Sequence, residues 1–109
     1  MSRYVFIESR DPFESRDCRF VSETARALKE SGNEVVVFLV QNGVLAARKK
    51  AIGSHLPSLS EAGVTLLADN FSLRERGIQR AELGWAIEEA GIDVLVDLIA
   101  TADTKAIWH

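Results

Sequence analysis

The stretch VTLLADNFSLRERGI, residues 64–78, decides the fold that this sequence predicts. It begins as an apolar run over 64–68, passes through Asp69 and Asn70, and continues into a charged segment that ends at Gly77. This order predicts a strand, a turn, a short helix and a helix stop. In open α/β sheets, ligands and reactive groups lie where the carboxyl end of a strand leads into a helix. We therefore expect a functional site around Asp69.

Two strands are predicted upstream of this stretch. Residues 3–8 and 34–40 are rich in β-forming side chains, and the apolar run of the second is uninterrupted, which is typical of a central strand in a parallel sheet. Between them, apolar residues at helical spacing predict an amphipathic helix that ends at Gly32. The start of this helix is left open, because Asp11 and Asp17 both suit the N-cap position.

The segment that joins the second strand to the third is expected to contain two helical pieces. Residues 41–43 have the composition of a turn. Helix-forming residues follow over 44–50, the segment 51–57 is irregular, and 58–62 has the pattern of a helical turn closed by Gly63. The alternation of strands and helices is the pattern of parallel crossovers, and it predicts an α/β fold.

The sequence signals for helices and strands are weaker after Gly77. Residues 79–82 fit a loop or a helix, and 83–87 fit a short strand or more helix. Residues 92–102 show both periodicities, and we expect a helix there because Asp93 is a good N-cap. A final short strand is expected over 105–108.

Composition and charge exclude several classes of function. The 109 residues carry a formal charge of −3 with acids and bases interspersed, so no basic face predicts nucleic-acid binding. The longest apolar run, 35–40, is far shorter than the ~20 residues that cross a bilayer, and the N-terminus lacks a basic stretch followed by an apolar one. We therefore expect one cytoplasmic domain with no membrane partner.

Cysteine and histidine usage predicts neither a disulfide nor a metal site. Cys18 is the only cysteine, and His55 and His109 lie too far apart to show metal-ligand spacing, so no metal or cofactor is expected. His55 is expected on a surface loop, and His109, the last residue of the sequence, is expected to be frayed. Trp85 and Trp108 are typical of a core or a subunit interface.

Short sequence patterns of low specificity, spread along nearly the whole chain, indicate a known family. They are the Asp11-Pro12 loop after the first strand, the Gly32 stop, the 41–44 segment after the second strand, the Arg76-Gly77 turn and a closing strand over 103–108. With these features the sequence resembles the DsrE/TusD (DsrE/DsrF-like) family of small sulfur-relay proteins. The resemblance implies a mostly parallel five-stranded sheet with helices on both faces, the DsrEFH-like fold. It also implies homo- or hetero-oligomers, commonly trimers or hexamers, and in some members the passage of persulfide sulfur between cysteines.

The main cysteine of that family is missing here. Its usual position, eight residues before the glycine of the Arg-Gly turn, falls on Asp69, and a second cysteine of some members falls on Ser72. Asp69 can act as a ligand-binding or general-base carboxylate, or as the N-cap of the following helix. Ser72 is close in size to cysteine but cannot hold a persulfide, and no nearby histidine or lysine is evident to activate it.

The candidate ligand-binding residues lie at two neighbouring strand ends. Arg74 and Arg76 can bind an anion or a partner carboxylate, or can lie solvated at a helix end. The amides of residues 41–43 can face a small ligand, or can simply form a tight turn. The predicted set is Asp69, Asn70, Ser72 and Arg76, together with Gln41, Asn42 and Gly43.

Cys18 is the only residue that can carry sulfur in this chain. A helix start and the flanking Arg16 and Arg19 would favour its thiolate. The alternative is a small buried side chain with no role in transfer.

These observations lead to one function hypothesis and two alternatives. We expect an oligomeric, cytoplasmic protein connected with sulfur metabolism, which binds a partner or a small ligand without catalysing transfer. One alternative is a sulfurtransferase that carries persulfide on Cys18 and works with a sulfur-relay partner. The other alternative is a structural assembly module.

Overall fold

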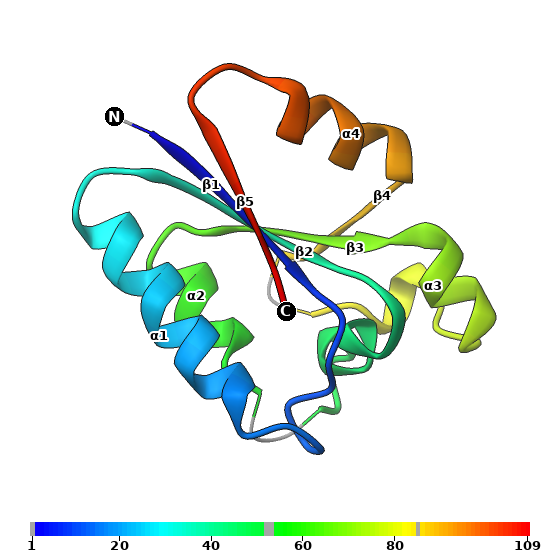
Figure 1. The fold of residues 1–109 in the computed structure, drawn as a ribbon. Helices are drawn as coiled ribbons and strands as arrows, with labels where there is room; N and C mark the ends of the chain where they lie inside the picture. The colour runs from blue at the N-terminus through cyan, green and yellow to red at the C-terminus, as the bar shows by residue number, and fades with distance from the viewer. Residues whose placement is uncertain (1, 52–53, 85) are drawn as a thin grey trace.

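The computed structural model describes residues 2–51, 54–84 and 86–109. These residues form a five-stranded sheet in which every strand pairing is parallel, in the order β4-β3-β2-β1-β5 (Figure 1). The predicted α/β class with a five-stranded, mostly parallel sheet is therefore confirmed. The strands are β1 (Arg3–Glu8), β2 (Glu34–Leu39), β3 (Thr65–Asp69), β4 (Glu88–Ala90) and β5 (Thr104–Trp108).

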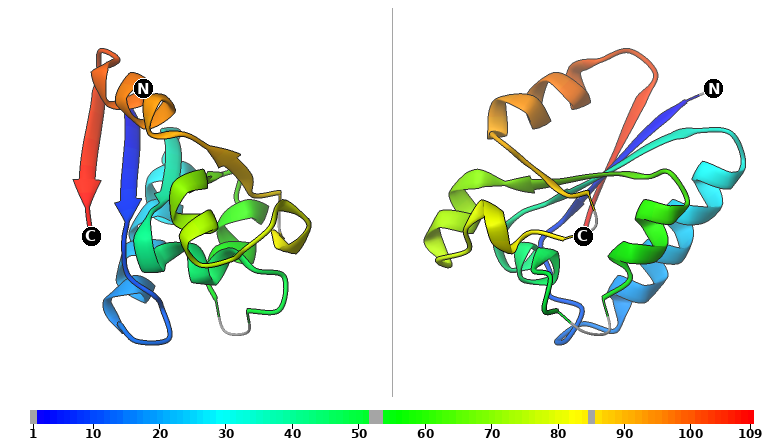
Figure 2. Two further views of the ribbon diagram at one scale, coloured as in Figure 1. Left: turned by 90° about the vertical axis from the view of Figure 1, so that its right-hand side faces the viewer. Right: turned by 180° about the vertical axis from the view of Figure 1, so that it is seen from behind.

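Helices cover both faces of the sheet, as predicted. The helices α1 (Asp17–Glu30) and α2 (Leu56–Glu61) lie on one face, and α4 (Ile92–Ala100) lies on the other (Figures 1 and 2). The short helix α3 (Asn70–Glu75) follows β3 directly, and the 3₁₀ helices η1 (Gln41–Ala47) and η2 (Arg80–Glu82) lie in the connections. None of the helices in the described part of the chain has the length and apolar character that crossing a membrane requires.

The strand β2 forms the centre of the core, because all of its residues after the first are buried. Its side chains alternate between the two faces of the sheet. Val37 packs in the cluster that contains residues of α1 and α2, whereas Phe38 packs in the cluster under α4. Burial on both faces explains the uninterrupted apolar run in the sequence.

The order of the strands creates a topological switch point between β1 and β5. From β1 the chain steps through β2 and β3 to β4, and α4 then brings it back to β5 on the other side of β1 (Figure 2). In open parallel sheets, a crevice forms at such a point, outside the carboxyl ends of the strands. Glu8 ends β1 and His109 follows β5, so both residues lie at this carboxyl edge of the sheet, beside the switch point.

Two predicted helix caps are wrong. The N-cap of α4 is Gly91, and Asp93 lies inside the first turn of the helix. At α1, Asp17 is the first helical residue rather than the cap, and the Asp11 side chain instead accepts a hydrogen bond from the backbone N–H of Phe13 at 3.0 Å. Aspartate is favourable in the first turn as well as at the cap, so composition does not separate these positions.

The segment after β2 also differs from its prediction. The helix η1 begins at Gln41, so the turn predicted over 41–43 is wrong, and helical structure ends at Ala47, short of the predicted limit. A side chain at Gly43 would collide with the carbonyl oxygen of Glu8. Gly43 is therefore required because η1 packs directly against the end of β1.

The last third of the chain is partly as predicted. The fourth strand is β4, which follows the segment 83–87 where a strand was one option, and Trp85 lies outside the described residues. Two of the three residues of β4 are glutamates, so this strand gives no hydrophobic signal. The helix predicted over 92–102 and the strand predicted over 105–108 are confirmed as α4 and β5.

We expect Gly43→Ala to lower the free energy of unfolding by about 1–3 kcal/mol, because the added methyl group forces η1 away from β1. Urea denaturation measures the change. Gly91→Ala is the matched control, because a Cβ there would meet mainly the mobile end of the Asp93 side chain. An unfolding free energy of Gly43→Ala equal to that of the wild type would contradict this packing.

Candidate functional site

Asp69 joins the end of β3 to the start of α3. Its Oδ2 atom accepts hydrogen bonds from the backbone N–H of Ser72 at 3.0 Å and from the Ser72 hydroxyl at 2.7 Å. Asp69 is therefore the N-cap of α3, which confirms one of the two roles that the sequence allowed. Both side chains are buried, with Asp69 7% exposed and Ser72 4% exposed.

The residues around Asp69 form a connected hydrogen-bond network. The Ser72 hydroxyl, which donates to Asp69, accepts a hydrogen bond from the backbone N–H of Gln41 at 2.8 Å. The guanidinium of Arg76 donates to Asn42 Oδ1 at 3.0 and 3.2 Å and to the Ser72 carbonyl oxygen at 3.2 Å. These contacts tie α3 to η1 and bring together the segments that follow β2 and β3.

An open groove of about 710 Å³ lies beside this network. The predicted residues that line it are Gln41, Asn42, Asp69, Ser72 and Arg76. Gly43 and Asn70, which were predicted with them, do not line it among the described residues. Sequence reasoning missed the remaining lining residues, which are Val40, Phe71, Glu75, Ile92, Leu95 and Trp108. The last three belong to α4 and β5, which reach the groove only through the tertiary fold, whereas the first three are sequence neighbours of predicted residues.

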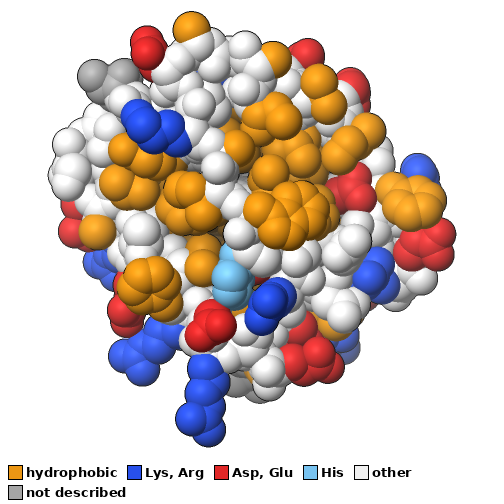
Figure 3. All heavy atoms as spheres, viewed as in Figure 1, with side chains coloured by type: hydrophobic (Ala, Val, Ile, Leu, Met, Phe, Trp, Pro, Cys, Tyr) orange, Lys and Arg blue, Asp and Glu red, His pale blue; other side chains and the backbone are white. Residues whose placement is uncertain are grey.

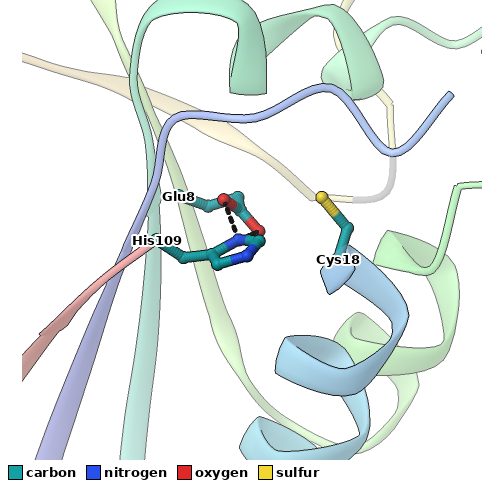
Figure 4. Close-up of side chains that lie close together, drawn as sticks. All are labelled: Glu8, Cys18 and His109. Carbon is teal, nitrogen blue, oxygen red and sulfur yellow. Dashed lines mark hydrogen bonds and ion pairs between the residues drawn. The ribbon is translucent and has the colours of Figure 1, made fainter. Parts of the chain in front are cut away.

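Cys18 does not lie in this groove. Cys18 is in the first turn of α1, Glu8 ends β1 and His109 follows β5, and the three side chains meet at the switch point (Figure 4). One potential ligand atom from each residue lies within 4.8 Å of the other two. We call these residues the Glu8–Cys18–His109 cluster. The Cys18 Sγ atom also lies 3.6 Å from the carbonyl oxygen of Arg10.

His109 is held by hydrogen bonds, so the prediction that it is frayed is wrong. Its backbone N–H donates to the Ile7 carbonyl at 2.9 Å, and its carbonyl accepts from the backbone N–H of Ser9 at 2.8 Å. Its Nδ1 atom lies 2.8 and 2.9 Å from the two carboxylate oxygens of Glu8. Sequence spacing gave no sign of this pair, because the residues are 101 positions apart and meet only through the register of β1 and β5.

The surroundings of Cys18 oppose its ionisation. Burial, and then the negative charge of Glu8 and a hydrogen bond to it, raise the pKa of the Cys18 thiol to about 12. The prediction that Arg16 and Arg19 favour the thiolate is therefore wrong. Arg19 instead pairs with Glu23 on the exposed side of α1, at 3.0 Å. Cys18 is a neutral thiol at neutral pH.

The groove and the cluster lie on opposite faces of the sheet. Side chains two residues apart in a strand point to the same face. Leu67, two residues before Asp69, packs under α4, whereas Phe6, two residues before Glu8, packs in the core on the side of α1. The two sites therefore share the carboxyl edge of the sheet but not a face.

The model of the DsrE/DsrF-like family matches residues 2–105 of the sequence. The chain belongs to the DsrE/DsrF-like family. The resemblance read from the sequence is thereby confirmed, and membership of this family suggests a function related to sulfur relay. No curated protein matches the sequence.

Several solved structures share the fold of this DsrE/DsrF-like chain. The ychN protein from E. coli is 21% identical and superposes with a TM-score of 0.88, over the whole of both chains. MTH1491 from Methanobacterium thermoautotrophicum, a protein of unknown function, is 20% identical with a TM-score of 0.81, again over both whole chains. BT1422 from Bacteroides thetaiotaomicron, also of unknown function, is 13% identical with a TM-score of 0.79, over 99% of this chain and 95% of its own.

Asp69 and Ser72 stand at the two positions where the DsrE/DsrF-like resemblance places cysteines. In the structure they bond to each other and cap α3. Cys18 is the only cysteine in the sequence and lies on the other face of the sheet, beside Val37 and Leu39. The groove of this family member therefore contains no thiol.

Cys18 of this DsrE/DsrF-like protein should react slowly with iodoacetamide at neutral pH, because the thiolate is the nucleophile and the thiol is favoured. Its rate should still be rising at about pH 10, where an ordinary thiol with a pKa of ~8.5 has nearly reached its plateau. Glu8→Gln should move the rise to lower pH, because it removes a negative charge beside Cys18. Mass spectrometry follows the reaction beside a free-cysteine peptide, and a wild-type plateau below about pH 9 would contradict the assignment.

Proposed function

We propose that this protein is a cytoplasmic homo-oligomer connected with sulfur relay. In this proposal it binds a small ligand or a segment of a partner protein in the groove beside Asp69, and the groove does not carry persulfide. The observation that supports it most is the buried pair of Asp69 and Ser72, which occupies both cysteine positions and holds α3 against η1.

The lining of the groove supports a binding role. Its volume of about 710 Å³ falls within the range of roughly 300–1,000 Å³ that is common for small-molecule sites. Asn42 and Arg76 offer an amide and a guanidinium that are already fixed against each other, while Ile92 and Trp108 offer apolar surface. A ligand with an anionic or carbonyl end and an apolar body fits this combination.

The backbone of Gln41 gives further support. Its φ angle is 50°, in the left-handed region that residues other than glycine seldom adopt. Its N–H donates to Ser72, so the network around Asp69 holds this conformation in place. Backbone strain of this kind gathers at ligand-binding positions.

Incubation with a persulfide donor, followed by intact-mass analysis, tests whether the protein carries sulfur. We expect no added sulfur on the folded protein, because Cys18 is a buried thiol of raised pKa and the groove has no cysteine. Alkylation of the unfolded protein controls for a free cysteine. A single added sulfur atom that is lost in Cys18→Ser would overturn the proposal and establish the sulfurtransferase alternative.

Exposed apolar side chains support the oligomeric part of the proposal. Hydrophobic side chains gather on the face of the molecule that carries β5 and α4 (Figure 3). Large apolar patches on a protein surface commonly mark interfaces. The exposed apolar residues of these two elements are Ile92, Val94, Val96, Ile99, Ile107 and Trp108.

Sedimentation velocity tests this assembly. We expect the wild type to sediment as a trimer or hexamer and Val96→Glu to dissociate toward the monomer, because a charge replaces a 53% exposed valine on α4. Phe20→Glu is the matched control, since Phe20 is 71% exposed but belongs to α1, which lies across the sheet from α4. A monomeric wild type at micromolar concentration would contradict the oligomer.

A further inference from the structure

The Glu8–Cys18–His109 cluster combines three different metal-ligand groups in one buried place. A carboxylate, a thiol and an imidazole come from the end of β1, the first turn of α1 and the residue after β5 (Figure 4). Glu8 is 7% exposed and Cys18 is 4% exposed, and the His109 side chain is 19% exposed. Buried ionisable groups cost free energy unless they are paired or bind a metal ion.

We propose that Glu8, Cys18 and His109 bind a divalent transition-metal ion, with Zn²⁺ as the expected species. Zinc takes cysteine sulfur, histidine nitrogen and carboxylate oxygen as ligands, and a site with three protein ligands leaves a fourth position open. Calcium and magnesium prefer sites made only of oxygen, so the thiol and the imidazole select against them. This inference does not depend on the function proposed for the groove, which lies on the other face of the sheet.

The geometry requires only a small adjustment. The ligand atoms lie within 4.8 Å of one another. Zinc–ligand distances of about 2.0–2.3 Å at tetrahedral angles would place them about 3.3–3.7 Å apart. The carboxylate of Glu8 and the Nδ1 atom of His109 are already 2.8 Å apart, so the closure falls mainly on Cys18, whose side chain can rotate about one bond.

The backbone around the cluster is already fixed. His109 hydrogen-bonds to Ile7 and Ser9, and Glu8 accepts a hydrogen bond from the backbone N–H of Arg10 at 3.2 Å. Glu8 and Cys18 also line a cavity of about 30 Å³, and about 10–15 Å³ is enough for one water molecule. The open coordination position therefore has room for a water. When the metal binds, the Cys18 proton passes to solvent, the proton between His109 Nδ1 and Glu8 moves to Nε2 or to solvent, and the sulfur, the nitrogen and the carboxylate bond to the metal.

The same three residues resemble the arrangement of a cysteine nucleophile with a histidine base and an orienting carboxylate. That role needs the thiol to hydrogen-bond to the imidazole. The Cys18 Sγ atom instead approaches the Arg10 carbonyl oxygen at 3.6 Å. The Nδ1 atom of His109 faces Glu8. A metal ion needs only the three ligand atoms close together, as they are here. Metal binding therefore accounts for the cluster better than nucleophilic catalysis does.

A cobalt titration tests the proposal, because Co²⁺ takes zinc sites and gives absorbance bands for thiolate ligation and tetrahedral geometry. The protein is the full chain without an affinity tag, treated with a chelator and then dialysed. We expect one Co²⁺ per chain, with a thiolate charge-transfer band in the near ultraviolet that Zn²⁺ abolishes. Native mass spectrometry then counts the zinc that replaces it.

Single-residue variants show whether the cluster is the site. Cys18→Ser should lose the charge-transfer band while keeping nearly the same side-chain volume. Glu8→Gln and His109→Gln should weaken binding by more than about 100-fold, since loss of an outer-shell partner alone costs about 10–100-fold. His55→Gln is the matched control for His109→Gln, because His55 lines the neighbouring cavity but is outside the cluster. Circular dichroism shows whether each variant is folded. If Glu8→Gln and His109→Gln unfold, Cys18→Ser decides the test.

Two results would overturn the proposal. The first is a wild-type protein that binds neither Co²⁺ nor Zn²⁺ with micromolar affinity, which would leave the cluster as an ion pair that holds β5 against β1. The second is Co²⁺ absorbance that persists unchanged in Cys18→Ser, which would place the bound metal elsewhere on the surface.

Discussion

The parallel pairing of β1 with β2 on one side and β5 on the other is the constraint on which both candidate sites depend. Parallel strands end at the same edge of a sheet, so the residues that follow β1, β2, β3 and β5 are brought together there. The register that pairs Ile7 with Trp108 sets His109 beside Glu8. The close packing of Gly43 against the end of β1 then positions η1, and with it the groove residues Gln41 and Asn42.

Alternation along the strands divides this edge into two environments with different chemistry. On the face of α4, the polar groups around Asp69 satisfy one another and border an open groove. On the face of α1, a carboxylate, an imidazole and a thiol lie together in a buried position. Low dielectric strengthens the interactions between charges in the second site and raises the cost of leaving any of them unpaired. Binding through shape and hydrogen bonds suits the first site, whereas binding of a cation suits the second.

The sequence predicted most of the fold and five of the residues that line the groove, whose ligand-binding role stays a prediction. The apolar run of β2, the glycine stops and the Asp69 cap are local signals, and all of them are found in the structure. The Glu8–Cys18–His109 cluster was missed because its members are up to 101 residues apart and meet only when β5 returns beside β1. The strand β4 was missed for a different reason, because an acidic edge strand of three residues has no hydrophobic pattern to detect.

Amide hydrogen exchange, resolved by residue with NMR, tests the central claim most directly. The amides of His109 and Ser9 close the register between β5 and β1, and the amides of Ser72 and Gln41 close the network around Asp69. The account predicts that these amides exchange far more slowly than those of an unstructured peptide. Exchange of His109 and Ser9 at the rate of an unstructured peptide would contradict it, because β5 would then not hold His109 beside Glu8.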